Sequence, residues 1–573
     1  MERYLRRKFE RKLGLVFLLF VVSLFLSGVR ALDLQITKES EAAKKIEESF
    51  SRTYIVKIPL YRGSLRDRNG KELALSVPTL TLYAHPNTRL IRNRRAFLQR
   101  LSSLSGVSVS VLEDRLREGQ DRPITILTGL ARDLEDELLR LIRETKNTRF
   151  IGVQRSYRRL YPNGSLASNL LGFVGTDGVG LEGMEYKLND YLGGGHTQAI
   201  LYFGGELGTV YLKPAGGLPG DEHDVYLTLD VGVQSILEAV RDDIVKRWKP
   251  KRVSILLMDV RTGEILGLAT YPYFDPNTFY KYPPQSRRNF AVTDVFEPGS
   301  IMKPFFVGYA LEKGYVSAGS VVDTGDGRIR VHDRYVRDPK RFSRLRLEDV
   351  LVHSSNVGTI KVASFLSRKE AEDLLRRFHL HARFGVFPGE AAPKLPDFRY
   401  PANILYSSIG QGIAMNSINI AVAFGALATG DVVKPKVVKE ILSPDGKKAY
   451  SMEVEVLKKD VFSKKTIRWL REALTKVVER GTGRRARSKF FTIAGKTGTS
   501  QKFDPALGRY SREKVVTYFA GFFPATKPRF VGVIVVDEPK GKRLFGGEVC
   551  APYFKKIVEL VAFYYGLKPD KVK

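Results

Sequence analysis

An apolar stretch without a charged residue runs from residue 13 to residue 29, directly after a basic segment at residues 1–12. A helix over this stretch would span about 26 Å, enough to cross a bilayer if Arg30 reaches the interface. The basic flank predicts a cytoplasmic N-terminus, with the rest of the chain outside. A cleaved signal peptide ending near Ala31 is the alternative. We favour a retained anchor at residues 13–32 and a single-pass protein of the cell (inner) membrane, with the rest of the chain on the periplasmic side.

The apolar pattern beyond this anchor first predicts several short elements. Residues 39–50 have the spacing of an amphipathic helix. Asn69-Gly70 precedes an apolar run and predicts a turn that joins two strands. A helix ending near residue 142 is predicted by leucines at helical spacing: Leu130, Leu134, Leu138 and Leu141. A glycine-rich segment at residues 216–221 closes this region.

Longer and more regular elements are predicted after residue 225. The expected helices cover residues 231–248, 416–428 and 552–565. The expected strands cover residues 253–259, 265–270, 490–494, 515–523 and 530–536. We therefore expect an α+β fold in which the chain after residue 225 holds a five-stranded, mostly antiparallel sheet, two strands early and three late, flanked by helices on both faces.

Composition adds a strong positive charge to this picture. The 573 residues carry a formal charge of +32, which favours polyanionic partners such as anionic lipid, phosphate-bearing lipid or nucleic acid. The single cysteine, Cys550, excludes an internal disulfide, and the seven histidines include no His-Glu-x-x-His pattern. We expect no metal and no cofactor. Cys550 is interpreted as a small buried residue.

The first candidate for chemistry is Ser300-Ile301-Met302-Lys303, preceded by Glu297-Pro298-Gly299. On a helix, residues three apart share a face, so the Lys303 amine can reach the Ser300 hydroxyl. A serine hydroxyl becomes a useful nucleophile when a neighbouring base takes its proton. Lysine can be that base if burial or a second cation lowers its pKa. Alone, this spacing is weak evidence, because most such pairs lie on solvated helix faces.

Two later stretches strengthen the case: Ser354-Ser355-Asn356 and Lys496-Thr497-Gly498-Thr499. All three motifs stand in the order found in serine acyltransferases that include penicillin-binding proteins and β-lactamases. Ser354 can relay a proton between Lys303 and a leaving amine, and Asn356 can hold Lys303 and the substrate. Lys496 adds a positive charge that helps to keep Lys303 neutral.

The third motif also suits a substrate terminus. Gly498 leaves a strand bare, so that an extended peptide can pair along its edge. The hydroxyls of Thr497 and Thr499 suit a terminal carboxylate. Backbone N–H groups of Ser300 and Thr499 would form the oxyanion hole. The catalytic residues are therefore predicted to be Ser300, Lys303, Ser354, Asn356 and Lys496, with Thr497, Gly498 and Thr499 binding substrate.

These motifs, together with the stretches around Asp67-Arg68-Asn69-Gly70 and Gly180-Leu181-Glu182-Gly183, resemble those of class B penicillin-binding proteins. The ending Ala520-Gly521-Phe522-Phe523-Pro524 is similar to the septal, cell-division type. The resemblance implies a peptidoglycan D,D-transpeptidase. Such an enzyme takes the acyl group of a stem peptide ending in D-Ala-D-Ala, releases D-Ala and binds β-lactams covalently.

The resemblance also implies an organisation and partners. We expect a cytoplasmic tail at residues 1–12, the anchor at 13–32, an elongated non-catalytic pedestal (dimerisation-like) domain at 33–225 and a transpeptidase domain at 226–573. The implied partners are stem peptides, the lipid-linked precursor, a SEDS-family glycosyltransferase, other divisome membrane proteins and β-lactam inhibitors. Nucleic acid is not expected as a partner, because the predicted topology is exported.

Several alternatives stay open. The elongation type of class B transpeptidase is the close rival, and a catalytically inert divisome scaffold is the main non-enzyme reading. A β-lactamase would need a water-activating Glu between the second and third motifs, where Glu390 is an unassigned carboxylate. A penicillin-sensing receptor would need further membrane spans. Glu185 opens a Glu-x-x-Leu-Asn sequence found in class A β-lactamases, which we attribute to chance because it lies upstream of Ser300.

One charged stretch near the start of the pedestal has two interpretations. The stretch contains Arg62, Arg66, Asp67 and Arg68 within seven residues. These side chains could bind an anion, but a structural network of salt bridges is the favoured interpretation.

Overall fold

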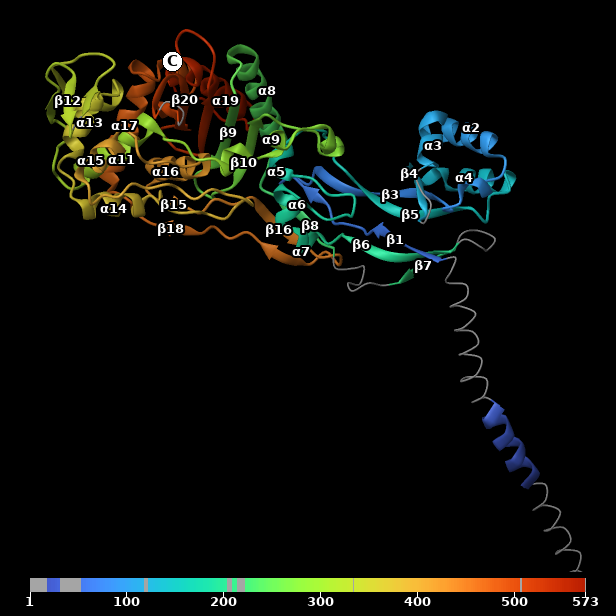
Figure 1. Cartoon of the computed structure of the whole chain (residues 1–573). Coiled ribbons are helices and arrows are strands. Elements are labelled where there is room, and N and C mark those ends of the chain that lie inside the picture. The colour runs from blue at the N-terminus through green and yellow to red at the C-terminus, as the bar shows by residue number, and fades with distance from the viewer. Residues whose placement is uncertain are drawn as a thin grey trace, which may run out of the picture. The chain divides into compact units, whose positions relative to one another are not determined.

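The computed structural model describes residues 18–30, 53–117, 122–202, 209–213, 222–332, 334–504 and 508–571 (Figure 1). The chain forms two compact units built from alternating segments. The small unit comprises Met1–Ile58, Pro78–Tyr157 and Thr197–Gly217, and the large unit comprises Pro59–Val77, Arg158–His196 and Leu218–Lys573. The predicted boundary between residues 225 and 226 stays a prediction.

Residues 18–30 form a helix whose described side chains are exposed. Among the described residues, no helix has the length and apolar character needed to cross a membrane. The rest of the predicted anchor, the basic tail, the expected helix at 39–50 and the glycine-rich segment at 216–221 lie outside the described residues.

The small unit pairs short helices with strands. Its elements are β1 (Thr53–Pro59), α2 (Arg94–Ser105), α3 (Val109–Arg115), β4 (Ile124–Ala131), α4 (Glu135–Glu144), β5 (Ile151–Leu160), β6 (His196–Tyr202) and β7 (Thr209–Lys213). Leu138 and Leu141 of α4 are buried in its core, as predicted. The predicted single helix through Leu130 is wrong at its start, because Leu130 lies in β4 and pairs with Leu80 of β3 (Glu72–Ala84).

The large unit is organised around a five-stranded sheet of order β10–β9–β21–β20–β19. The strands are β9 (Arg252–Asp259), β10 (Ile265–Tyr271), β19 (Ala494–Asp504), β20 (Arg509–Phe523) and β21 (Phe530–Asp537). Every neighbouring pair is antiparallel. The predicted sheet of two early and three late strands is confirmed. The first late strand begins at Ala494, so the expectation of a strand from residue 490 is wrong in its first residues.

Helices cover both faces of this sheet because side chains alternate along each strand. On β21, Ile534 and Val536 pack with α8 (Val231–Trp248) and α19 (Ala551–Tyr564). Val533 and Val535 face the opposite side, with α16 (Ser417–Thr429), α11 (Lys303–Glu312) and α17 (Lys464–Arg480). Figure 1 shows α16 on one side of the sheet and α8 with α19 on the other.

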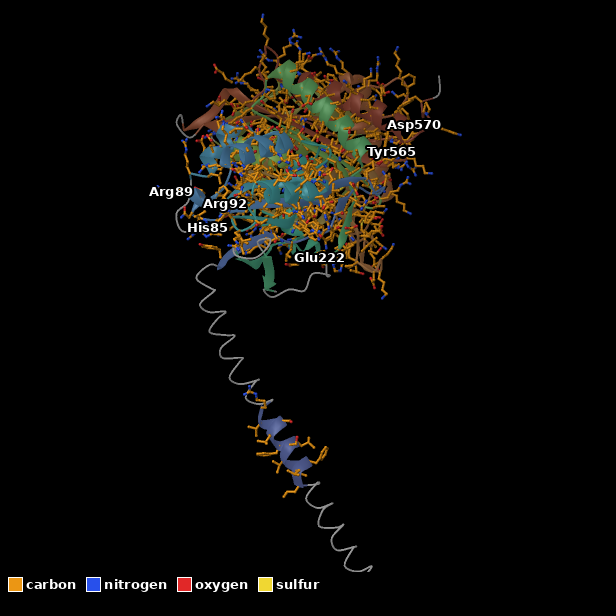
Figure 2. The ribbon with its side chains drawn as sticks, turned by 90° about the vertical axis from the view of Figure 1, so that its right-hand side faces the viewer. His85, Arg89, Arg92, Glu222, Tyr565 and Asp570 are labelled. Carbon is orange, nitrogen blue, oxygen red and sulfur yellow. The ribbon has the colours of Figure 1, made fainter. Side chains whose placement is uncertain are left out.

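Side-chain caps explain why two predicted helices begin where they do. Asp230 Oδ1 accepts hydrogen bonds from Gly232 N (2.9 Å) and Val233 N (3.2 Å), which fixes the first turn of α8. Asn416 and Asn419 form a capping box at the start of α16. Tyr565 Oη, labelled in Figure 2, donates to Asp230 Oδ2 at 3.1 Å and joins the C-terminal end of the chain to α8.

The charged stretch around residue 62 forms the predicted salt-bridge network. Arg62 pairs with Glu185 (2.7 Å), Arg66 with Glu72 (3.3 Å) and Asp224 (3.6 Å), and Arg68 with Glu264 (3.2 Å). Asp67 Oδ1 accepts from Asn69 N (2.8 Å) and Lys71 N (2.9 Å). These last bonds close the Asn69-Gly70 turn between β2 (Leu65–Arg66) and β3, which confirms the predicted turn.

The remaining elements of the large unit surround the sheet. They include α5 (Ser168–Leu171), α6 (Gly183–Lys187), α7 (Asn189–Leu192), β8 (Asp224–Leu227), α10 (Phe290–Thr293), β12 (Arg328–Val331), β13 (Arg334–Arg337), β14 (Arg344–Arg346), α12 (Leu347–Val352), α13 (Asn356–Ala363), α14 (Arg368–Arg377), α15 (Pro401–Ser408), β16 (Val438–Leu442), β17 (Lys448–Ser451) and α18 (Gly546–Val549).

Candidate active site

Ser300 lies in a short 3₁₀ turn, η5 (Gly299–Met302), that leads directly into α11. Gly299 has a φ of +57°, and a Cβ there would lie 2.8 Å from Thr499 O of β19. Glycine is therefore required, both for the left-handed conformation and for the close approach of the strand. Ser300 is half-buried, and Lys303 follows one turn later at the start of α11.

Lys303 has no exposed surface, and its amine is held by the second motif. Lys303 Nζ donates to Ser354 O at 2.5 Å, to Ser354 Oγ at 3.2 Å and to Asn356 Oδ1 at 2.7 Å. Among the described residues, no hydrogen bond joins Ser300 Oγ to Lys303. The structure thus brings Lys303, Ser354 and Asn356 into direct contact and places Ser300 one helical turn away.

The second motif is shaped as a tight turn into α13. Ser354 has a φ of +58°, which is unusual for a residue with a side chain and holds its carbonyl and hydroxyl towards Lys303. Ser355 caps α13, and its Oγ accepts from Gly358 N at 2.8 Å. Asn356 begins the helix, which orients its side chain.

Asp338 fixes this turn, and the sequence analysis did not single it out. Its Oδ1 accepts from Asn356 N (2.5 Å) and Val357 N (3.0 Å), and its Oδ2 accepts from Ser355 Oγ (2.6 Å). A carboxylate at the first turn of a helix satisfies otherwise unpaired N–H groups. Asp338 follows strand β13 and has no motif spacing that would have identified it.

The third motif completes the cluster from strand β19. Lys496 Nζ donates to Ser354 Oγ at 2.8 Å and to Thr497 O at 3.1 Å, and Lys496 is also fully buried. A Cβ at Gly498 would lie 2.8 Å from Pro298 O, so only glycine lets the Ser300 segment pack so closely on the strand. All three motifs therefore meet around Ser354 Oγ, which lies between two lysine amines.

Burial shapes the electrostatics of this cluster. It lowers the pKa of Lys303 to about 7, and the negative charge of Asp338 opposes this shift. Burial and the charge of Lys303 together hold the pKa of Lys496 well below its ordinary value. We expected Lys496 and burial together to keep Lys303 neutral, and the larger cause is the removal of its amine from water.

Strand β19 offers a bare edge and two hydroxyls. Among the described strands, β20 is the one hydrogen-bonded neighbour of β19, so its other edge is open to an extended peptide. Pleating places Thr497 and Thr499 on one face of β19. Thr499 Oγ1 accepts from Gly546 N at 3.1 Å, and Thr497 Oγ1 shares a hydrogen bond of 2.8 Å with Thr482 Oγ1, a residue that no pattern had identified.

Glu297, just before Ser300, is tied by three hydrogen bonds to two other segments. Its Oε1 accepts from Tyr510 Oη and from Gly412 N, each at 2.9 Å, and its carbonyl oxygen accepts from Tyr518 Oη at 2.9 Å. These bonds hold the start of the Ser300 turn against β20 and the loop after α15. The turn is therefore fixed from both sides.

Two other candidates have structural roles. Glu390 is buried, and its carboxylate accepts from Phe384 N (2.8 Å) and Val386 N (2.9 Å), so it closes a loop. Cys550 is buried, as predicted, and burial raises the pKa of its thiol to about 12.

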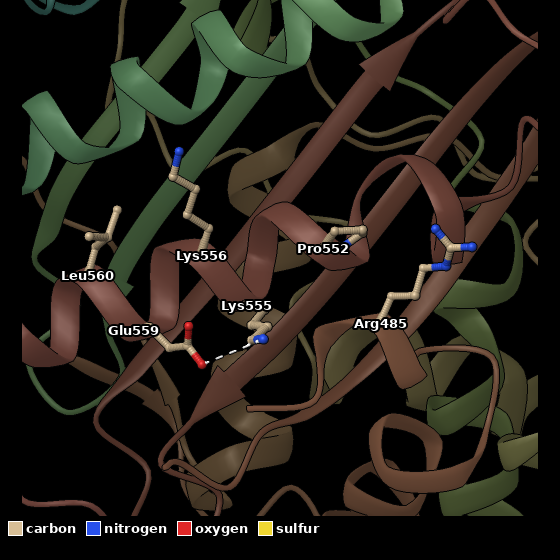
Figure 3. Close-up of a pocket in the computed structure, with 6 residues that line it drawn as sticks. All are labelled: Arg485, Pro552, Lys555, Lys556, Glu559 and Leu560. Carbon is tan, nitrogen blue, oxygen red and sulfur yellow. Dashed lines mark ion pairs between the residues drawn. The ribbon is translucent and has the colours of Figure 1, made fainter. Parts of the chain in front are cut away.

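An open groove on α19 is lined by Arg485, Pro552, Lys555, Lys556, Glu559 and Leu560 (Figure 3). Each of its cations already has an acidic partner. Lys555 lies 4.0 Å from Glu559, and Arg485 lies 2.7 Å from Glu548. Lys556 pairs with Asp243 of α8. This groove has no charge left to neutralise a ligand and contains none of the predicted site residues.

Comparison with known families agrees with this geometry. Residues 253–559 match the penicillin binding protein transpeptidase domain, and residues 57–201 match the penicillin-binding protein dimerisation domain. The first match contains all three motifs. The second covers much of the predicted pedestal.

Individual relatives extend the likeness over nearly the whole chain. A probable peptidoglycan D,D-transpeptidase PenA from Neisseria meningitidis is 32% identical, covering 97% of this chain and 93% of its own. Peptidoglycan D,D-transpeptidase FtsI from Escherichia coli K12 is 29% identical, covering 89% of this chain and 84% of its own.

Solved structures show the same fold. The crystal structure of penicillin binding protein 3 from Mycobacterium tuberculosis superposes with a TM-score of 0.68 at 25% identity, covering 90% of this chain and 98% of that one. The same protein in complex with aztreonam gives equal values. The resemblance inferred from the motifs is confirmed: the chain belongs to the class B penicillin-binding proteins and is a transpeptidase of that family.

Proposed function

We propose that this protein is a peptidoglycan D,D-transpeptidase of the septal type that cross-links stem peptides through an acyl-enzyme on Ser300. The observation that carries this proposal is the position of Ser354 Oγ, 3.2 Å from Lys303 Nζ and 2.8 Å from Lys496 Nζ. This hydroxyl connects the base beside the nucleophile to the strand that would hold the substrate.

Acylation uses the neutral amine of Lys303. Ser300 Oγ attacks the carbonyl carbon of the penultimate D-Ala while Lys303 accepts the hydroxyl proton. Backbone N–H groups of Ser300 and Thr499 stabilise the oxyanion. The proton passes through Ser354 Oγ to the nitrogen of the leaving D-Ala, the peptide bond breaks, and an ester to Ser300 remains.

Cross-linking reverses these proton transfers. The amine of a second stem peptide attacks the ester, and its proton returns through the same relay to Ser300 Oγ as the ester bond breaks. Asn356 holds the Lys303 amine through a 2.7 Å hydrogen bond during both steps. Thr497 and Thr499 bind the terminal carboxylate of the donor.

The cellular role proposed is septal wall synthesis from the cell (inner) membrane. The likeness to FtsI and penicillin binding protein 3 supports the septal type. The basic residues 1–12 and the apolar run that follows support a single-pass anchor. The proposed partners are the lipid-linked precursor, a SEDS-family glycosyltransferase and other divisome membrane proteins.

Intact-mass spectrometry after mixing with benzylpenicillin tests the enzymatic part. We expect one long-lived adduct on Ser300 and none in Ser300→Ala, because the tethered leaving group blocks an acceptor and Glu390 is engaged by backbone N–H groups. Rapid return to the unmodified mass would indicate a β-lactamase. An adduct on another serine would overturn the site assignment.

The cellular part is tested by imaging a fluorescent fusion in growing cells. The septal type predicts a band at midcell. Signal spread along the side wall would favour the elongation type. Protease added from outside should digest the chain beyond residue 32, and a mature N-terminus at Leu32 would reject the anchor.

A further inference from the structure

The hairpin of β12 and β13 carries an unusual arrangement of arginines. Its antiparallel register places Arg328 opposite Arg337, and Arg330 opposite Tyr335. Residues directly opposite share a face, so these four side chains lie together on one surface of the hairpin, and all four are exposed. We call this surface the cationic hairpin; it is labelled through β12 in Figure 1.

Core packing does not require these arginines. The opposite face of the hairpin contributes Val331 to a buried cluster with Ile360 and Ile409, and Ile329 and Val336 pack against it. The arginine face points away from that cluster. Apolar residues on one face are enough to hold the hairpin in place.

The arginine face also carries a local electrostatic cost. Like charges directly opposite one another in a sheet are destabilising, and Arg328 and Arg337 are such a pair. Asp326 offsets part of this charge, at 2.6 Å from Arg328 Nε. The segment 326–346 still contains eight Arg and Lys residues against three Asp residues, one of which, Asp338, is engaged by the turn at Ser355.

The cationic hairpin borders the catalytic cluster. Asn356 Nδ2 donates to Arg337 O at 2.8 Å, and Asn356 Oδ1 accepts from Lys303 Nζ at 2.7 Å. One asparagine side chain therefore separates the base from the backbone of β13. The hairpin that carries the arginines is therefore attached to the catalytic cluster at Asn356.

We propose that the cationic hairpin binds carboxylate groups of the acceptor stem peptide, the one whose amine resolves the acyl-enzyme. This inference rests on the proposed function. The donor peptide is excluded as the occupant because its terminal carboxylate belongs on β19, beside Thr497 and Thr499. Guanidinium groups bind carboxylates through paired hydrogen bonds, and Arg328 and Arg330 lie two residues apart on one strand, ready for successive carboxylates.

The test uses the full chain and the double variant Arg328→Gln/Arg330→Gln. A thioester donor forms the acyl-enzyme, and transfer to a carboxylate-bearing stem tetrapeptide is compared with transfer to the same peptide with amidated carboxyl groups. We expect the KM for the carboxylated acceptor to rise about 3- to 10-fold, and the KM for the amidated one to stay the same. Added salt should raise the wild-type KM towards that of the variant.

The matched control is Lys464→Gln/Arg468→Gln, which removes two exposed cations from α17 and should leave both KM values unchanged. Acylation by benzylpenicillin reports the first half of the reaction separately. Wild-type protein without any acylation would reject the proposed function, whereas normal acylation with equal KM changes for both acceptors would reject only the hairpin.

A second outcome would also overturn the proposal. If the double variant loses binding to vesicles of anionic lipid while its acceptor KM is unchanged, the hairpin contacts the membrane instead. A variant that fails to fold is replaced by Arg337→Gln alone, whose backbone bond to Asn356 does not depend on its side chain. The same selective rise in KM is then required.

Discussion

Two clusters of the large unit, one around Glu185 and one around Ser354, bury cationic side chains. At the first, Glu185 is fully buried and accepts from Arg62 Nε and Arg159 Nε, each at 2.7 Å, and from Tyr161 Oη at 3.1 Å. Burial would raise the pKa of Glu185, but the charges of Arg159 and Arg62 outweigh it and hold that pKa below its ordinary value. The carboxylate stays ionised and pairs with both guanidinium groups.

In the part of the chain that the structure describes, no carboxylate contacts the two amines of the second cluster. Lys303 and Lys496 donate to hydroxyl, carbonyl and amide oxygens. Asp338, whose charge raises the pKa of Lys303, hydrogen-bonds the turn at Ser355 instead. A buried amine without a paired carboxylate loses its proton more readily. With a carboxylate in contact, buried cationic side chains form a structural brace, as around Glu185. Without one, a buried amine can act as a proton acceptor, as at Lys303.

Replacing Lys303 should separate these two roles most clearly. In Lys303→Met, acylation by benzylpenicillin should fall about 10²- to 10⁴-fold, because no other group accepts the Ser300 proton. The melting temperature should fall less than in a variant of the Glu185 brace. The reason is that Lys303→Met replaces a buried amine that has no carboxylate partner by an apolar side chain of similar size. Stopped-flow acylation and thermal melting measure the two effects. Retained acylation would place the base elsewhere.

Replacing Glu185 should give the opposite result. Glu185→Gln leaves two arginines buried without a counter-charge, which should cost about 3–5 kcal/mol of unfolding free energy. Acylation per folded molecule should stay at the wild-type level. Glu372→Gln is the control, since its pair with Arg368 is largely exposed and should be worth about 0–1 kcal/mol. Equal destabilisation by both variants would contradict the brace.

Elements with strong periodicity and clear caps were predictable from the sequence. The bounds of α8 match the prediction because Asp230 caps one end and the apolar spacing is unbroken to Trp248. Leu130 was misassigned because its spacing fits a helix, whereas pairing with Leu80 across two strands decides its conformation. Local pattern cannot reveal such a partner fifty positions away.

The site residues that belong to sequence motifs were predictable. Motif order brought Ser300, Lys303, Ser354 and Lys496 together before any geometry was known. Asp338 and Thr482 were not found, because each acts through backbone or hydroxyl contacts that only the folded chain brings together. Both burial and a second cation were expected to lower the pKa of Lys303, but which is larger could not be predicted, since burial is a property of packing and not of spacing.

Asp338 acts on Lys303 through its charge. This negative charge favours the protonated form of Lys303, although Asp338 hydrogen-bonds the turn at Ser355 and not the Lys303 amine. Removing that charge in Asp338→Asn should lower the pKa of Lys303 further. Acylation requires the neutral amine, so the acylation rate of the wild type should rise with pH near the Lys303 pKa of about 7. This rise is the acid limb of the rate–pH profile. In the variant this acid limb should move to lower pH by about one unit. A limb that moves upward would show that Asp338 acts on the turn and not on the base.

The smallest shift is expected for Lys496→Met, and it decides what sets the base. If a charged Lys496 kept Lys303 neutral, removing it would raise the pKa of Lys303 and move the acid limb of acylation to higher pH. The structure indicates otherwise, because burial is the leading cause of the lowered pKa of Lys303. Methionine at position 496 preserves the burial of Lys303, so the acid limb should stay within about half a unit of pH 7. The lost hydrogen bond to Ser354 Oγ should still lower the rate at every pH. Rate–pH profiles of penicillin acylation for the wild type and Lys496→Met measure this directly, and an upward shift of a full unit would make the second cation, not burial, the cause of the reactive amine.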